Sequence, residues 1–237
     1  MKHQLVLCLF CFLLLTNCNK EETIKDNKVT VQFSFVNANG TTNANRFYNF
    51  DVAKTLVLFS NFEYVDAIGN ATKVKDVFLV KQNNMSFKFD VPAGYYHAFR
   101  FSFGIDTSLN NRLPMSFPAD NPLSVESGLY WDMLKYRFMV MQGNIDSSFA
   151  KNKTPNLPFS MHLGSDTLYT IINVPEVPLQ NALVNIQIDL KSLMTLDAEP
   201  FKITNFSNHS EPSDITNAVA IKNSFVNNIK VETTYPE

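Results

Sequence analysis

Three histidines that could bind a metal ion are spread along the chain beyond Cys18, namely His97, His162 and His209. Their spacing matches neither a zinc finger nor one face of a helix, so a metal site built from them must be assembled by the fold. His97 lies on the apolar face of a predicted strand, where we expect a hydrogen-bonded core histidine. His162 falls on the polar face of the sheet-like run 159–163. His209 lies in a polar loop ahead of a predicted helix, and it is either a metal ligand or an exposed surface histidine.

Four methionines and the only tryptophan of the chain lie in one stretch of the sequence: Trp131, Met133, Met139, Met141 and Met161. Thioethers suit Cu(I), whereas carboxylates suit harder ions. Met139 and Met141 share one face of a predicted strand, and methionines in strands more often fill a core than bind a metal. Met133 precedes that strand and is the least committed to packing. Trp131 is either part of a site or a buried aromatic anchor of the fold.

Enzyme signatures are missing from the sequence. It contains no nucleophile elbow, zinc-protease helix motif, phosphate-binding loop or dinucleotide fingerprint. Asp106, Asp120 and Asp132 could form a carboxylate pair for glycoside hydrolysis, but a sequence does not give their separation. We therefore expect a binding protein and not an enzyme.

The first residues have the pattern of an export signal. Residues 5–15 are almost entirely apolar, a run too short for a permanent membrane-spanning helix but suited to a signal peptide. Residues 15–18 resemble a bacterial lipobox, which predicts a signal peptide over 1–17 and a lipid on Cys18. The alternative is an ordinary secretory signal. A polar tether over 18–28 and one domain over 29–237 would follow, so that only the lipid contacts the membrane.

The amino-acid composition excludes several kinds of site and partner for the predicted domain. The cysteines are Cys8, Cys11 and Cys18, so the exported domain has neither a disulfide nor a thiolate metal site. The formal net charge is -2, which gives no electrostatic case for nucleic acid. The 21 phenylalanines supply enough aromatic area for a large core, so stability must come from packing. We expect a cell-envelope lipoprotein of the outer membrane, exposed at the cell surface.

Alternation of apolar and polar residues dominates the predicted domain. Strands are expected over 29–35, 56–65, 74–81, 85–91, 95–103, 136–142, 167–174 and 184–190. Short strands separated by turn residues are typical of an antiparallel β-sandwich, so the predicted fold class is all-β. Residues 105–129 and 145–158 are expected to form long loops. A helical repeat of apolar residues predicts one C-terminal helix from about 214 to 228, with Ser213 or Asp214 as its N-cap.

Several short motifs, taken in order, resemble the MbnP-like family of exported copper-binding proteins. They comprise Val-Pro-Ala-Gly-Tyr at 91–95, Phe-Gly-Ile-Asp at 103–106, Gly-Leu-Tyr-Trp at 128–131, Met-His-Leu-Gly at 161–164 and Ile-Asp-Leu at 188–190. His209 and a helix containing Ala-Val-Ala follow. The match covers about residues 29–229, and it is similar to the surface copper proteins of methane-oxidising bacteria. Each motif is short, but their shared order is fairly specific.

The resemblance implies a copper site with particular residues. In copper-binding relatives a tryptophan of this segment can be oxidised to kynurenine by a diheme peroxidase-like partner, and the modified ring joins histidines around Cu(I). Carried over, Trp131 is the modifiable residue and His209 the distal ligand, with His162 and Met133 as further candidates. Relatives tend to have a tryptophan or histidine where this chain has Met133, so a thioether takes the place of a ring here. The implied role is copper uptake or storage.

A second function remains open. The two long loops could make the protein a non-metal surface module that binds a glycan or a protein partner. Exposed tyrosine and phenylalanine side chains in 105–129 are expected to suit that role.

Overall fold

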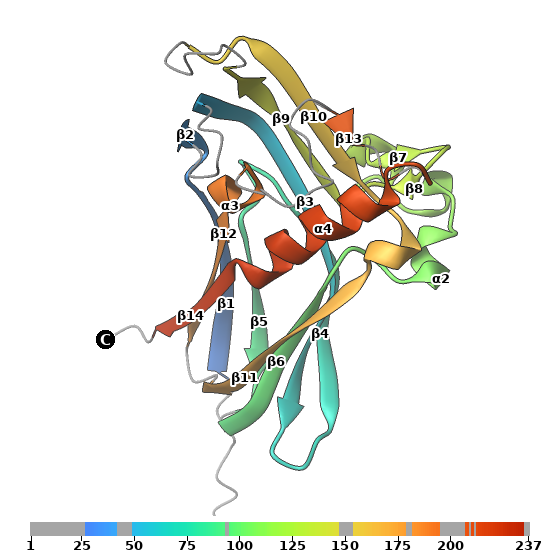
Figure 1. The fold of residues 1–237 in the computed structure, drawn as a ribbon. Helices are drawn as coiled ribbons and strands as arrows, with labels where there is room; N and C mark the ends of the chain where they lie inside the picture. Colours follow the sequence, from blue (N-terminus) through green and yellow to red (C-terminus); the bar gives the residue numbers. More distant parts are fainter. Residues whose placement is uncertain are drawn as a thin grey trace, which may run out of the picture.

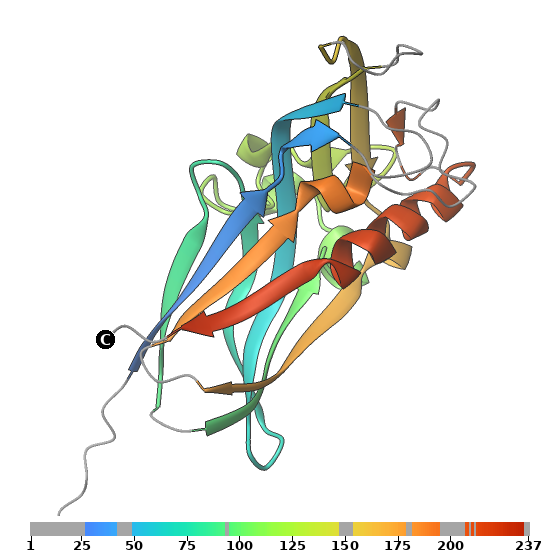
Figure 2. The same cartoon turned by 60° about the vertical axis from the view of Figure 1, so that its left-hand side comes forward.

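Strands make up most of the computed structural model, which describes residues 27–41, 49–92, 95–146, 154–178, 182–194, 207–208, 210 and 212–234. Two of the predicted functional residues, Cys18 and His209, lie outside these ranges. Most of the strands form two sheets that face each other (Figures 1 and 2). Among the described residues, no helix is long and apolar enough to cross a membrane.

The smaller of the two facing sheets has the order β14-β12-β1-β5. Its strands are β1 (Asn27–Val36), β5 (Ser86–Val91), β12 (Leu183–Asp189) and β14 (Ile229–Thr234). β1 runs parallel to β12, while the other pairings in this sheet are antiparallel. Val29, Val31 and Phe33 of β1 are buried, as the predicted alternation requires.

The larger sheet has the order β11-β6-β3-β9-β10-β13, with β2 and β4 also paired to β3. Its strands are β2 (Asn39–Thr41), β3 (Asn49–Asp66), β4 (Ala71–Val80), β6 (Tyr95–Phe103), β9 (Met139–Ile145), β10 (Leu157–Leu163), β11 (Thr170–Pro178) and β13 (Ser207–Asn208). A separate two-stranded sheet consists of β7 (Tyr130–Trp131) and β8 (Lys135–Tyr136). Because antiparallel pairs predominate, the predicted all-β sandwich is confirmed.

Phenylalanine rings fill the space between the two sheets. Phe33 of β1 stacks on Phe59 of β3 with 5.2 Å between ring centroids, and Phe59 also meets Phe101 of β6 edge to face. Phe62 stacks on Phe101 at 5.6 Å. All four rings are almost completely buried. Contacts of this kind stabilise the sandwich by removing a large apolar area from water.

Short helices and one longer helix complete the fold. They are α2 (Thr107–Asn110), η1 (Pro114–Ser116), η2 (Val125–Ser127), η3 (Asp166–Leu168), α3 (Leu190–Met194) and α4 (Ile215–Asn227). The predicted C-terminal helix is therefore confirmed, with Asp214 at the N-cap position. Its buried Phe225 contacts Phe59 and Phe103 of the larger sheet. The chain then continues into β14, which the sequence analysis did not predict.

Several local predictions were wrong, among them the strand expected over 136–142, which is divided between β8 and β9. His97 is exposed instead of lying in the core, because the β3–β6 pairing shifts by one residue between Val65 and Asp66 and reverses the facing of β6 there. The predicted loop 145–158 is shorter, since β9 and β10 pair as far as Ile145 and Leu157. Residues 166–168 form η3, so the strand expected from Thr167 begins at Thr170.

Candidate functional site

Trp131 lies on a short hairpin at the end of the sandwich that also carries the loop 104–129 (Figure 1). β7 and β8 pair Tyr130 with Tyr136 and Trp131 with Lys135. The turn is closed by the Leu134 amide, which donates to the Trp131 carbonyl over 3.0 Å, and by Lys135 with a φ of 59°. Tyr130 packs against the core, whereas Trp131 is half-buried and is not part of the core cluster. Trp131 therefore lies at the margin of the core and not inside it.

His162 lies on β10, on the strand face that points away from the core. Phe159, Met161 and Leu163 are buried, so Ser160 and His162 share the opposite face. The Nε2 atom of His162 is 2.9 Å from Ser160 Oγ and 3.1 Å from Gln142 Nε2 of the neighbouring strand β9. The placement of His162 on the polar face of 159–163 is thus confirmed.

The fold brings Trp131 and His162 into direct contact. Their ring centroids are 5.7 Å apart and the rings meet edge to face at 79°. The Arg137 guanidinium carbon lies 5.7 Å from the centroid of the Trp131 ring, within the range of a cation–π interaction. We call Trp131, Arg137, Gln142, Ser160 and His162 the Trp131 cluster.

The guanidinium of Arg137 is held in place by hydrogen bonds to the preceding loop. Its Nε donates to the Leu129 carbonyl over 3.2 Å, and its Nη2 donates to the Gly128 carbonyl. Gly128 ends η2 in the left-handed conformation with a φ of 62°, which favours glycine. Burial lowers the pKa of Arg137. The loop therefore holds a cation against the indole face.

The candidate thioethers fall into two environments. Met139, Met141 and Met161 are buried among the core side chains, as the packing interpretation predicts. Met133, in contrast, is 65% exposed on the turn between β7 and β8. It lines a cavity of about 480 Å³ together with residues of η3 and the start of α4. Of the four candidates, Met133 alone is accessible to a ligand.

The segment that contains His209 approaches the same strand as His162. In β13, Asn208 pairs with Met161 of β10. Ser210 is buried, and its Oγ accepts a hydrogen bond from the Gly164 amide over 3.3 Å. His209 itself lies outside the described residues, but both of its chain neighbours lie beside β10 and its end.

The donors at this place fit a soft metal better than a hard one. The Trp131 cluster offers one imidazole and no carboxylate, and Met133 lies on the same hairpin as Trp131, but the cavity that it lines includes Asp166 and no residue of the cluster. Imidazole and thioether suit copper, and thioether selects Cu(I) in particular. Among the described residues, no three histidine, cysteine, aspartate or glutamate side chains form a group that could hold a metal ion.

Arg137, Gln142 and Ser160 were missed by the sequence analysis. Gln142 and Ser160 face each other across the β9–β10 ladder, which joins residues 18 positions apart. The alternation in 159–163 could have placed Ser160 beside His162, because residues two apart share a face. Nothing in the sequence pattern gave the position of Arg137 over the indole.

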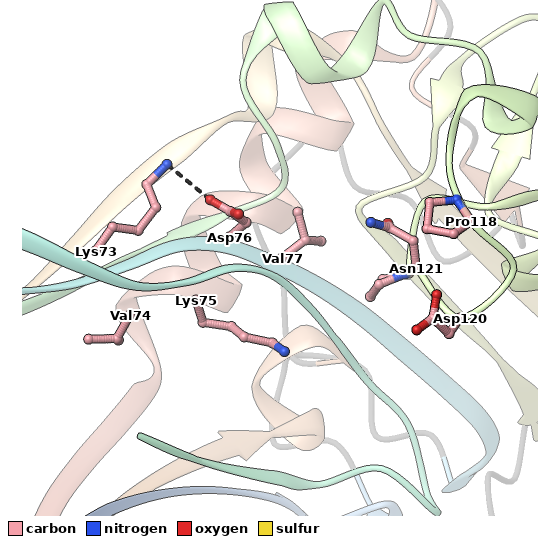
Figure 3. A pocket seen from close by; sticks show the side chains of 9 residues that line it. Lys73, Val74, Lys75, Asp76, Val77, Pro118, Asp120 and Asn121 are labelled. Atoms are coloured by element: carbon pink, nitrogen blue, oxygen red, sulfur yellow. Dashed lines mark ion pairs between the residues drawn. The ribbon is translucent and has the colours of Figure 1, made fainter. Parts of the chain in front are cut away.

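A polar cavity of about 530 Å³ lies between β4 and the loop 118–122 (Figure 3). Lys73 and Asp76 form an ion pair of 3.2 Å at its edge, while Lys75 and Asp120 line its wall.

The expectation of exposed aromatic side chains in 105–129 was wrong. The stretch contains no tyrosine, and Phe117 is half-buried beneath the Arg112 guanidinium at 4.1 Å.

Comparisons with known proteins agree with this architecture. A solved structure, MbnP from Methylosinus trichosporium, matches with a TM-score of 0.54 and 16% sequence identity, over 83% of this chain and 88% of that chain. No curated protein matches. The family model for MbnP matches residues 26–222, which is most of the sequence. The chain therefore belongs to the MbnP family.

Proposed function

We propose that the protein is an exported, lipid-anchored copper-binding protein that serves copper uptake or storage. The observation that carries the proposal is the contact between Trp131 and His162, whose ring centroids are 5.7 Å apart. Membership of the MbnP family supports it. Copper would be held by His162 and His209, with the Met133 thioether as a further ligand and Trp131 beside them.

The residues around His162 suit a metal ligand. Histidine ligands are usually oriented by a hydrogen bond to the ring nitrogen that does not bind the metal. If the metal were bound at Nδ1, the protonated Nε2 would donate to Ser160 Oγ, which lies 2.9 Å away, and this hydrogen bond would fix the ring. A bound Cu(I) ion supplies a soft, redox-active centre. The family resemblance adds a partner, a diheme peroxidase-like protein that would oxidise Trp131.

The anchor would hold the site away from the membrane. β1 begins at Asn27, at the end of the sandwich opposite to the β7–β8 hairpin (Figures 1 and 2). A lipid on Cys18 would therefore attach the protein to the outer membrane and leave the Trp131 cluster facing outward. The protein would contact the bilayer through that lipid only and would have no catalytic activity.

A Cu(I) competition titration on residues 19–237 tests the metal role. We expect one copper ion per chain, with His162→Ala and His209→Ala each weakening the affinity at least about tenfold, because each removes a ligand. His97→Ala is the matched control, since His97 is exposed on β6 near Tyr95, far from β7 and β8. Equal losses in all three variants would contradict the proposal.

Absence of copper binding needs a second measurement before it is interpreted. Intact-mass analysis of protein from the native host would report whether Trp131 carries added oxygen. A modified protein that still fails to bind Cu(I) would overturn the copper proposal. An unmodified protein that fails to bind would call for the same titration after treatment with the peroxidase-like partner.

The cavity beside Lys75 and Asp120 favours a second candidate, a surface module that binds a glycan or a protein. Lys73, Lys75, Asp76, Asp120 and Asn121 give its lining charged and polar groups, and the loop is tied locally because the Asn121 side chain accepts from the Leu123 amide and Ser124 Oγ donates to the Ala119 carbonyl. A glycan array probed with the wild type and with Lys75→Ala tests this candidate. Binding lost in that variant would support it, while an array without signal would count against a glycan ligand.

A further inference from the structure

Among the residues that the structure describes, one edge of β3 is left unpaired for four residues. On this edge β2 pairs with residues 49–51, and the Val52 amide also donates to the Ala38 carbonyl over 2.8 Å. β4 takes over only at Val57, which pairs with Val80. Among the described strands, none pairs with residues 53–56 on this side, although β9 pairs along the other edge. The larger sheet therefore has a gap between β2 and β4.

Backbone groups of Thr55 point into this gap. The Leu58 amide donates to the Phe138 carbonyl on the β9 side of β3. Because backbone groups alternate between the two edges of a strand, Leu56 faces β9 as well, whereas Thr55 and Val57 face the opposite edge. Val57 meets β4 there, but Thr55 meets no described strand. An unpaired edge of this kind is a template for an added strand.

A cavity of about 590 Å³ lies at the same gap. Five consecutive residues of β3, Val52–Leu56, line it. In a regular strand only alternate residues would face one cavity, but the β3–β9 register shifts between Val52 and Lys54, which marks a bulge. The remaining lining comes from the end of β1 and the residues just after it, the β4–β5 turn and the start of α3.

The cavity is apolar inside and positively charged at its rim. Phe35, Leu56 and Met85 are partly buried and pack against the core. Lys54 and Lys81 are exposed, and the lining contains no carboxylate. A ligand that fits must therefore combine apolar groups with negative charge.

We propose that this gap binds a short extended peptide segment with alternating apolar and acidic residues, which adds a strand between β2 and β4. The backbone of the ligand would pair with Thr55, as in other complexes formed by strand addition. Its apolar side chains would enter beside Phe35 and Leu56, and its carboxylates would meet Lys54 and Lys81. An acyl chain with an acidic head matches the charge and the apolar lining but not the unpaired backbone, so the peptide is the better match.

Fluorescence anisotropy with a labelled peptide, Glu-Val-Glu-Val-Glu, tests the proposal on the protein from residue 19 onward. N-methylation of the three internal residues removes the internal backbone donors on both edges of the peptide without removing apolar area, and we expect it to weaken binding about tenfold. A Lys-Val-Lys-Val-Lys peptide should bind more weakly still. Lys54→Ala and Lys81→Ala should each weaken binding about threefold to fivefold, whereas Lys88→Ala, an exposed lysine on β5 outside the cavity, should not.

Three results would overturn the proposal. The first is no binding of Glu-Val-Glu-Val-Glu up to millimolar concentration. The second is equal binding of the N-methylated peptide, which would show that no strand is added. The third is displacement by dodecanoate together with tolerance of N-methylation, which would identify the gap as an acyl-chain site. None of these results depends on copper, because the cavity shares no residue with the Trp131 cluster.

Discussion

Two aromatic contacts in this molecule have nearly the same separation between ring centroids but different ring orientations, stacked at 18° and edge to face at 79°, and opposite surroundings. Phe33 and Phe59 lie 5.2 Å apart between the sheets, and Trp131 and His162 lie 5.7 Å apart at one end of the sandwich. The first pair is almost completely buried among other phenyl rings. The second pair is half-buried, with a guanidinium, a hydroxyl and an amide around it.

The difference separates stability from function. A phenyl ring in the core has apolar neighbours on every side, so its removal leaves a cavity and costs free energy of folding. The Trp131 cluster buries less apolar area, and its polar atoms can be solvated when a neighbour is removed. Substitutions there should therefore change binding and spectroscopic properties much more than they change the free energy of unfolding.

The largest expected effect is that of Phe59→Ala. Phe59 contacts rings of β1, β6 and α4, so the cavity would destabilise the protein by about 3–5 kcal/mol. Trp131→Phe should cost less than about 1 kcal/mol, as expected for a side chain outside the core. Urea unfolding followed by far-ultraviolet circular dichroism measures both values. Similar losses in the two variants would place Trp131 in the core and remove the distinction drawn above.

An intermediate effect is expected at Tyr136, which joins the two regions. Its ring is completely buried and its hydroxyl donates to the Leu123 carbonyl over 2.9 Å. Burial raises the pKa of Tyr136 from 10.0 to about 12. The unfolded chain therefore loses this proton first as the pH rises. The contribution of protonated Tyr136 to the free energy of unfolding is fully present below about pH 10. It is lost between about pH 10 and 12, which lowers the free energy of unfolding by roughly 2–3 kcal/mol.

Urea midpoints at pH 9 and pH 11.5 check this dependence. In Tyr136→Phe the fall between the two pH values should be smaller, because the variant has no phenol at this position. It should not vanish, since burial also raises the pKa of Tyr96. An unchanged fall in the variant would mean that Tyr136 ionises as readily in the folded protein as in the unfolded chain.

Sequence alternation predicted the sandwich because most strands have one face in the core. Residues 29–35, 95–103 and 184–190 all became strands over nearly the expected range. β14 was not predicted although its burial alternates along the strand, because Ile229 also fits the helical repeat that precedes it. His97 was misplaced by a bulge, and a bulge depends on how the neighbouring strand pairs.

The Trp131 cluster was predicted only as separate residues. Trp131 and His162 were both singled out, but their contact depends on the β9–β10 register and on a hairpin whose strands are two residues long. Strands this short leave almost no periodic pattern in a sequence. The gap beside β3 was not foreseen for a similar reason, since it is defined by where β2 ends and β4 begins.

A smaller effect is expected of Arg137→Ala, which tests whether the loop 104–129 supports the Trp131 cluster. The variant removes the guanidinium from the indole face together with its hydrogen bonds to the Gly128 and Leu129 carbonyls, and should cost about 1–2 kcal/mol of unfolding free energy. Because the chain has one tryptophan, its fluorescence reports on this cluster alone, and a more hydrated indole should emit at longer wavelength. Arg112→Ala is the matched control, since Arg112 lies over Phe117 instead. A red shift in Arg137→Ala but not in Arg112→Ala would show that the arginine shields Trp131 from water, whereas identical spectra would mean that the hairpin alone sets the environment of the indole.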